Sequence, residues 1–174
     1  MDFAFSQERR VMILVGGGSR SGKSRYALEL ARQRGVRPAF LATAQAFDDE
    51  MTERIRKHRE ERGDGFVTLE EPFELANALR AQRECDVIVV DCLTLWVSNL
   101  MLSDREIPAN ELIAAARESA ATVIFVSNEV GCGIVPENPL ARRFRDLAGA
   151  LNQRVAAAAD EVYWMAFGIP LKVK

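Results

Sequence analysis

The feature that most constrains this chain is a glycine-rich run near its start that fits the pattern Gly-x-x-x-x-Gly-Lys-Ser. The run follows an apolar stretch, Val11–Val15, and leads into a stretch with helical spacing, Ser24–Arg34. Glycines let backbone N–H groups close around phosphate oxygens, and the N-terminus of a following helix adds positive potential. The alternative is a glycine-rich turn that carries Gly-Lys-Ser by chance. We predict a loop that binds nucleotide phosphates, formed by Gly17, Gly18, Ser19, Arg20, Ser21, Gly22, Lys23 and Ser24.

Two side chains of this loop and one acidic residue predict how the nucleotide is held. The Lys23 ammonium can reach the β- and γ-phosphates, and the Ser24 hydroxyl can bind Mg²⁺. Such loops need an acidic residue at the end of a neighbouring strand, and Asp91 ends the apolar run Val87–Val90. We therefore expect Asp91 to help hold the metal. The alternative is that Asp91 caps the helix that follows it, a position that aspartate favours.

Apolar runs and helical stretches alternate along the chain. The runs are mostly continuous and rich in β-branched residues, which is typical of parallel strands covered on both faces. The remaining runs are Ala39–Thr43, Thr122–Val126 and Val162–Phe167, and the helices expected between runs are Asp48–Arg62 with Asp48 as its N-cap, Phe73–Arg83, Leu93–Ser103, Asn110–Ser119 and Pro139–Ala159. This order predicts an α/β fold, a mostly parallel sheet with helices on both faces. We expect a short leader at 1–11 and a single domain at 12–174.

Composition excludes several classes of function. Lys and Arg total 23 and Asp and Glu total 25, a net charge of -2, which argues against a dedicated nucleic-acid binder. The 3 cysteines form no Cys-x-x-Cys pair and there is 1 histidine, so a zinc site built from Cys and His is nearly excluded. No apolar run approaches the ~18–20 residues of a membrane span. We therefore expect a protein of the reducing cytoplasm that binds no nucleic acid and has no membrane span.

The one histidine, His58, lies in a strongly cationic stretch. It follows Met51 by seven residues and Ile55 by three, so we expect it to share their apolar face and to point inward. The plain interpretation is a packed or capping histidine near a helix C-terminus. Cations near an inward histidine, however, suit a polyphosphate and oppose a charged imidazole, which leaves a nitrogen lone pair available as a nucleophile. These cations are Arg54, Arg56, Lys57, Arg59 and Arg62.

A polar, glycine-punctuated segment, Asn128–Asn138, follows the run Thr122–Val126. Loops at the C-terminal ends of parallel strands are where open α/β sheets bind ligands, and a purely structural loop is the alternative. With this segment the sequence resembles the bifunctional adenosylcobinamide kinase / adenosylcobinamide-phosphate guanylyltransferase family of cobalamin biosynthesis. The resemblance covers about residues 12–174 and rests on Gly17–Ser24 with Arg25, Ala42-Thr43, Asp48–Met51 with Arg54, Ile55 and His58, Asn128–Pro136 with Asn138, Arg142–Asp146, Asn152–Arg154 and Ala159–Val162.

The resemblance implies two reactions. The family phosphorylates the aminopropanol hydroxyl of adenosylcobinamide with ATP or GTP. A histidine, whose position falls on His58 here, then attacks the α-phosphate of GTP and releases pyrophosphate, and the GMP passes to adenosylcobinamide phosphate to give adenosylcobinamide-GDP. A P-loop NTPase fold with a RecA-like sheet and a homotrimer are also implied. The implied nucleotide contacts, besides Gly17–Ser24, are Ala42, Thr43, Ala44, Arg59, Glu60, Glu61, Arg62, Glu70 and Asp91.

The chain departs from the family pattern at a few places, and none removes a catalytic part. Asp91 stands where relatives can carry glutamate, His58 stands alone where some have two adjacent histidines, and the segment 102–111 is short. One phosphate loop can serve both reactions, because it stabilises charge on the β- and γ-oxygens in γ-transfer and in the departure of pyrophosphate. Two rival hypotheses are a plain small-molecule kinase with a structural His58 and a nucleotide switch that engages a protein partner.

Overall fold

The computed structural model describes residues 11–46 and 49–174. At its centre lies one sheet of 7 strands in the order β3-β2-β4-β5-β1-β6-β7. Neighbouring strands are parallel throughout, except that β6 and β7 are antiparallel. The strands are β1 Met12–Gly17, β2 Pro38–Ala42, β3 Val67–Glu70, β4 Val87–Asp91, β5 Thr122–Asn128, β6 Glu161–Ala166 and β7 Ile169–Lys172.

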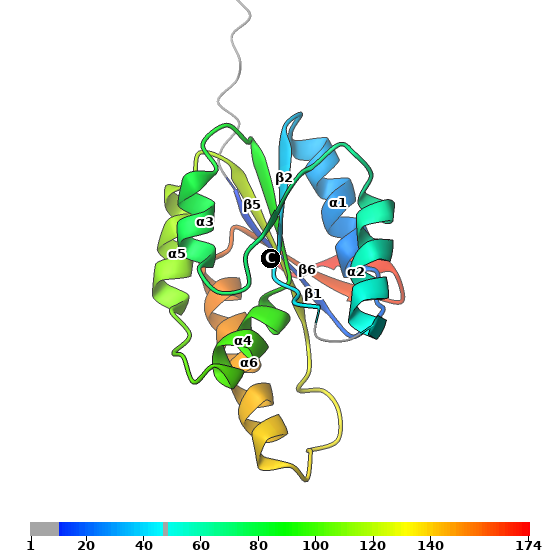
Figure 1. Cartoon of the computed structure of the whole chain (residues 1–174), viewed down its shortest axis with the longest axis vertical. Helices are drawn as coiled ribbons and strands as arrows, with labels where there is room; N and C mark the ends of the chain where they lie inside the picture. Colours follow the sequence, from blue (N-terminus) through cyan, green and yellow to red (C-terminus); the bar gives the residue numbers. More distant parts are fainter. Residues whose placement is uncertain (1–10, 47–48) are drawn as a thin grey trace, which may run out of the picture.

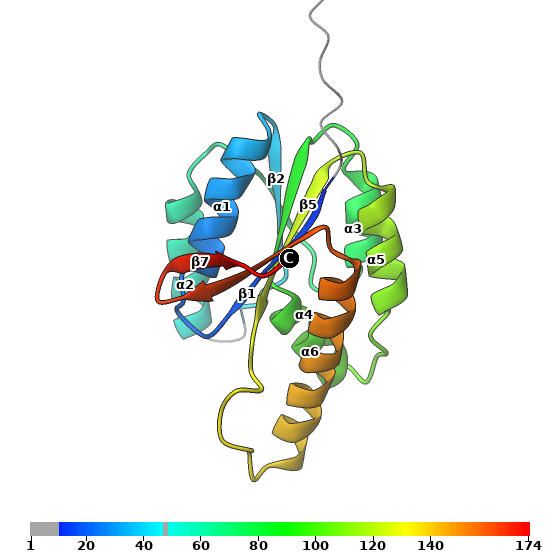
Figure 2. The ribbon, with the colours of Figure 1, turned by 180° about the vertical axis from the view of Figure 1, so that it is seen from behind.

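Helices cover both faces of this sheet, as Figures 1 and 2 show from opposite sides. The helices α1 and α2 lie on one face, and α3 to α6 lie on the other. The predicted α/β fold with a mostly parallel sheet is therefore confirmed. The helices are α1 Lys23–Arg34, α2 Asp49–Arg62, α3 Leu75–Ala81, α4 Leu93–Leu102, α5 Ala109–Glu118 and α6 Pro139–Ala158.

The continuous apolar sequence of the central strands follows from their position between two helical layers. In β1, Met12 and Leu14 belong to the core cluster under α3 to α6, whereas Ile13 and Val15 belong to the cluster under α1. Successive side chains of a strand point to opposite faces, so a strand covered on both faces needs apolar residues at every position. The structure thus has two cores that share one sheet.

Two strands at the edges of the sheet were not expected from the sequence. The β3 side chains are mostly exposed, with Val67 at 59% and Leu69 half-buried, so its sequence lacks a continuous apolar run. The β7 residues are exposed throughout and follow β6 after a turn at Phe167-Gly168, where both residues have positive φ. Edge strands bury less than central ones, and the apolar signal that identified the other strands is correspondingly weak there.

Helix ends match the predictions to within one residue for most elements, but α3 is shorter than expected. It spans Leu75–Ala81 and not Phe73–Arg83. Before it, the backbone N–H groups of Phe73 and Glu74 donate to the Glu71 carboxylate at 2.9 and 2.8 Å, which holds a turn where a helix was predicted. The predicted N-cap Asp48 lies outside the described residues.

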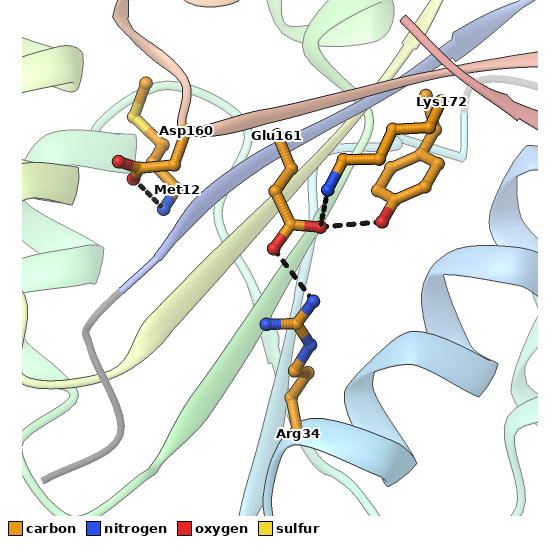
Figure 3. A network of polar contacts seen from close by, with 6 residues as sticks. Met12, Arg34, Asp160, Glu161 and Lys172 are labelled. Atoms are coloured by element: carbon orange, nitrogen blue, oxygen red, sulfur yellow. Dashed lines mark hydrogen bonds and ion pairs between the residues drawn. The ribbon is translucent and has the colours of Figure 1, made fainter. Parts of the chain in front are cut away.

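Polar contacts fasten the amino edge of the sheet around Glu161 (Figure 3). The Arg34 guanidinium at the end of α1 donates to Glu161 at 2.8 Å, and the Tyr163 hydroxyl donates to its other oxygen at 2.6 Å. Burial opposes ionisation of Glu161, but these two bonds outweigh it and hold its pKa below the usual value. The backbone N–H of Met12 donates to Asp160 at 2.9 Å. Helix α1, β1 and β6 are therefore tied together at the edge opposite the phosphate loop.

Within residues 11–46 and 49–174, no helix combines the length and the apolar character needed to cross a membrane. The division into a leader at 1–11 and a domain at 12–174 stays a prediction, because residues 1–10 lie outside the description.

Candidate active site

The glycine-rich loop joins β1 to α1, as predicted. Gly17 has φ 146° and Gly22 has φ 91°, both in the region that favours glycine. A Cβ at Gly17 would lie 2.9 Å from the carbonyl oxygen of Met165, closer than a side chain can approach. Helix α1 begins directly after Gly22, and no described side chain caps it. Its N-terminal N–H groups therefore face the loop with their positive potential.

Lys23 lies across this loop. The residue is 7% exposed, and its Nζ donates to the carbonyl oxygen of Gly18 at 2.5 Å and contacts the Ser21 hydroxyl at 3.4 Å. A phosphate bound in the loop would meet the same ammonium. The role of Lys23 as a ligand of nucleotide phosphates stays a prediction.

Asp91 ends β4 beside this loop, and the Ser24 hydroxyl donates a hydrogen bond to its carboxylate. Burial raises the pKa of Asp91 above its usual value, while the Ser24 bond and the charges of His58, Lys23 and Arg62 act in the opposite direction. The alternative of a helix cap is wrong, because the N-cap of α4 is Cys92 and has no side-chain bond. A hydroxyl and a carboxylate in contact are oxygen ligands of the kind that Mg²⁺ takes from proteins.

His58 lies on α2 with an exposed side chain, so the expectation that it points inward is wrong. The helix is too polar to bury a full face, and Ile55 is only half-buried; Met51 is among the α2 side chains outside the description. The charge of His58 nevertheless acts on Asp91, which places the imidazole near the loop. His58 is therefore both exposed to solvent and close to the phosphate loop.

Arg62, the last residue of α2, takes the buried position. It is 5% exposed, and its guanidinium stacks over Phe40 at 4.0 Å from the ring centroid. Burial lowers the pKa of Arg62, the charge of Arg59 adds to this, and the charge of Asp91 opposes it. Ser24, Lys23, His58 and Arg62 thus converge on one carboxylate from separate segments of the chain.

A cavity of about 500 Å³ opens where α2 ends and β3 begins. Three predicted nucleotide contacts, Arg59, Arg62 and Glu70, line it, and Arg59 pairs with Glu70. The volume lies in the range of small-molecule sites. The remaining lining residues are Gly63, Asp64, Phe66 and Thr68. Arg62 belongs to both the cavity and the Asp91 cluster, so the two form one continuous site.

The family described as Cobinamide kinase / cobinamide phosphate guanyltransferase matches residues 13–173. The chain belongs to this family. The bifunctional adenosylcobalamin biosynthesis protein CobP of Pseudomonas aeruginosa is 43% identical over 166 residues, which cover 92% of this chain and 96% of the relative. CobU of Salmonella typhimurium, which has the same descriptive name, is 42% identical over 184 residues, 94% of this chain and 100% of the relative.

Solved structures outside the family share the fold. An ATPase of a bacterial type III secretion system matches with a TM-score of 0.53 at 13% identity, over 93% of this chain and 56% of the other. The VirB11 ATPase of the Brucella suis type IV secretion system matches with a TM-score of 0.52 at 15% identity, over 97% of this chain and 48% of the other. These matches show the P-loop NTPase architecture of the family member.

The predicted contacts Ala42, Thr43 and Ala44 lie where β2 ends and the following loop begins. Thr43 is fully buried, and its hydroxyl both donates to the carbonyl oxygen of Cys92 and accepts from the Cys92 N–H, each at 2.8 Å. The Asn99 amide donates to the Thr43 carbonyl at 2.8 Å. The Thr43 side chain therefore fastens the segment that follows β2 to the segment that follows β4.

A second buried network lies at the end of β5. The Ser127 hydroxyl donates to Asn152 at 2.6 Å, the Asn152 amide donates to the Asn128 carbonyl at 3.1 Å, and the Asn128 N–H donates to Thr94 at 2.7 Å. The N–H of Glu129 then donates to the Gly17 carbonyl at 3.0 Å. Helix α6 and helix α4 are thereby joined to the first residue of the phosphate loop.

Sequence reasoning did not single out Asn99 and Thr94, which hold these strand ends. Both are polar residues in a mostly apolar helix, and that contrast was the available signal. Of the other predicted contacts, Glu60 is exposed and pairs with Arg56, and the Glu61 side chain lies outside the description. Among the described residues, no group of three or more His, Cys, Asp or Glu is placed to hold a metal ion.

Proposed function

We propose that this chain phosphorylates the aminopropanol hydroxyl of adenosylcobinamide with ATP or GTP and then guanylylates the product. In the second reaction, GMP from GTP would pass through His58 to adenosylcobinamide phosphate, giving adenosylcobinamide-GDP. The family's description names both activities, and the curated relatives are named bifunctional. The observation that carries the proposal is the phosphate loop between β1 and α1, with Lys23 bonded across it, in a chain that belongs to this family.

In the first reaction, the loop Gly17–Ser24 would hold the β- and γ-phosphates against Lys23 and the N-terminus of α1. The acceptor oxygen attacks the γ-phosphorus, and the bond from that phosphorus to the β–γ bridging oxygen breaks. Ser24 and Asp91 are the residues that would hold Mg²⁺. When bound, this ion neutralises charge on the β- and γ-phosphate oxygens.

In the second reaction, the neutral imidazole of His58 would attack the α-phosphorus of GTP, and the bond to the α–β bridging oxygen breaks to release pyrophosphate. Lys23 and the loop would stabilise the charge on the departing pyrophosphate. A phosphate oxygen of the acceptor then attacks the same phosphorus, and the imidazole leaves. The cavity lined by Arg59, Arg62 and Glu70 is proposed to hold the rest of the nucleotide.

The proposal includes a homotrimer in the cytoplasm, and its support is the family resemblance. The mass of the native protein in solution tests the trimer.

The decisive experiment is incubation of the purified protein with Mg²⁺ and GTP labelled at the α-phosphate. We expect a covalent label that is labile to acid and stable to alkali, as a phosphoramidate is. The label should be absent in His58→Ala and present in the control Lys57→Met, an exposed neighbour on the same helix.

Three outcomes separate the hypotheses. A wild type that phosphorylates adenosylcobinamide but takes no label is a kinase alone. A protein that hydrolyses nucleotide, takes no label and phosphorylates nothing is a nucleotide switch. Lys23→Ala should lose both activities by a factor of about 10² or more, and labelling that persists in this variant would refute one shared phosphate loop.

A further inference from the structure

The two reactions leave one side chain of α6 unexplained. Nη1 of Arg145 is buried and has no hydrogen-bond partner among residues 11–46 and 49–174. A guanidinium carries five N–H donors, and buried donors in proteins are nearly always paired. The nearby Arg142 is satisfied, because its Nη1 donates to the carbonyl oxygens of Pro136 and Glu137 at 2.9 and 2.6 Å. The buried nitrogen of Arg145 indicates a partner that is not part of the described chain.

Helical spacing places Arg145 beyond the end of the sheet. It shares a face of α6 with Ala148, which is buried, and with Asn152, which bonds Ser127 and Asn128 at the end of β5. Seven residues separate Arg145 from Asn152, about 10 Å along a helix axis. The N-terminal part of α6 extends past the strand ends, as Figure 1 shows. Arg145 therefore lies toward the carboxyl edge of the sheet, the edge at which the phosphate loop follows β1.

The second reaction creates a charge problem that the loop does not solve. Adenosylcobinamide phosphate is an anion, and it must approach a guanylyl group that also carries a phosphate. The cations grouped around Asp91, Lys23 and Arg62, are placed for the phosphates of the nucleotide. A separate cation is needed to bind the acceptor phosphate, and an arginine does so through two parallel hydrogen bonds.

We propose that Arg145 binds the phosphate group of the phosphorylated acceptor and so makes guanylyl transfer selective for adenosylcobinamide phosphate. The inference rests on the proposed function and assigns the acceptor side of the same site. Arg145 has no role in binding unphosphorylated adenosylcobinamide or in the attack of His58 on GTP.

Steady-state kinetics of Arg145→Met test this role. The KM for adenosylcobinamide phosphate in guanylyl transfer should rise roughly 10- to 100-fold, the equivalent of a charge-assisted hydrogen bond. The KM for adenosylcobinamide in the kinase reaction and the rate of labelling by GTP should stay within about twofold of wild type. Arg143→Met removes the same charge from an exposed position of α6 and should change none of the three.

Each other result overturns the proposal. An unchanged KM for the phosphorylated acceptor excludes phosphate binding, equal rises for both acceptors assign Arg145 to the corrinoid, and slower labelling assigns it to the GTP phosphates. Arg145→Lys is the second variant if Arg145→Met does not fold. Lysine keeps the charge but cannot form two parallel hydrogen bonds, so we expect a smaller rise in the KM for adenosylcobinamide phosphate. An unchanged KM contradicts the proposal. If the wild type itself transfers no GMP, the proposed function fails and not this assignment alone.

Discussion

The helices α2 and α4 follow two neighbouring strands, β2 and β4, but they are held in opposite ways. Helix α4 is mostly apolar, and two of its polar residues, Thr94 and Asn99, are buried and bonded to the ends of β5 and β2. Helix α2 is charged, and its ion pairs Glu53–Arg56 and Arg56–Glu60 lie on an exposed surface. Buried hydrogen bonds fix a position strongly because leaving them unmade is costly, whereas exposed ion pairs contribute little.

This difference separates the part of the site that holds the phosphate loop from the part that carries His58. The strand ends and α4 form a fixed frame for the phosphate loop and for Asp91. His58 lies on α2, where Arg62, stacked over Phe40, is the buried residue among the described side chains. A frame for phosphates must be rigid before the nucleotide arrives, since preorganised donors stabilise charge best.

The largest effect is expected for the substitution Asn99→Ala in α4. Its amide donates to the carbonyl oxygens of Thr43 at 2.8 Å and Pro72 at 3.1 Å. Leaving one buried and one partly buried carbonyl unpaired should lower the free energy of unfolding by about 3 kcal/mol. Urea unfolding of the purified variant measures this loss. A change below about 1 kcal/mol would mean that the α4 side is no more rigid than the α2 side.

A smaller effect of opposite sign is expected for Asp91→Asn in the nucleotide-free protein. Burial raises the folded-state pKa of Asp91 above 3.8, its usual value, so its ionised form costs stability. The protonated form of Asp91 is favoured in the folded protein, and the wild type loses that contribution to stability as the pH rises through the raised pKa. The variant should therefore melt at a higher temperature than wild type at pH 7, and the two should converge below pH 3.8.

Thermal melts across this pH range, with circular dichroism as the signal, check the prediction. The same variant should lose kinase activity, because the amide is a poorer ligand for Mg²⁺ than the carboxylate. A variant that is less stable than wild type at pH 7 would show that Asp91 supports the fold and not only the site.

The smallest effect is expected on α2. The hydrogen bond and charge of Arg56 lower the pKa of Glu53 to about 2, yet both side chains are exposed to solvent. Glu53→Gln and Arg56→Gln should therefore leave the melting temperature within experimental error of wild type. Differential scanning calorimetry in low salt is the most sensitive check. A clear drop in the melting temperature of either variant would show that the charged surface of α2 contributes to the stability of the fold.

The sequence predicted the parts of the site that depend on local spacing. The loop Gly17–Ser24 lies between a strand and a helix because the glycine pattern and its neighbours are contiguous in the chain. Asp91 was found because it ends a continuous apolar run, and that run marks a central strand. Both features require only a short window of sequence.

The features that sequence reasoning missed depend on packing between distant segments. Helical periodicity placed His58 on the same face as Ile55, but whether that face is buried depends on how α2 lies against its neighbours. The exposed edge strands β3 and β7 carry no continuous apolar signal. The unpaired nitrogen of Arg145 follows from the three-dimensional surroundings of α6 and has no counterpart in spacing.

The contact of the phosphate loop with β6 has a consequence for how the protein folds during its own synthesis. Gly17 packs against Met165, and Gly22 lies next to Gly168, so that a Cβ placed on Gly22 would be only 3.5 Å from the Gly168 Cα. Both partners lie at the end of β6 and in the turn that follows it, after α6 in the sequence. A nascent chain that has emerged only as far as α6 contains the whole loop sequence but lacks Met165 and Gly168, against which the loop packs. The loop can therefore reach its final shape only after β6 and the turn to β7 have been synthesised.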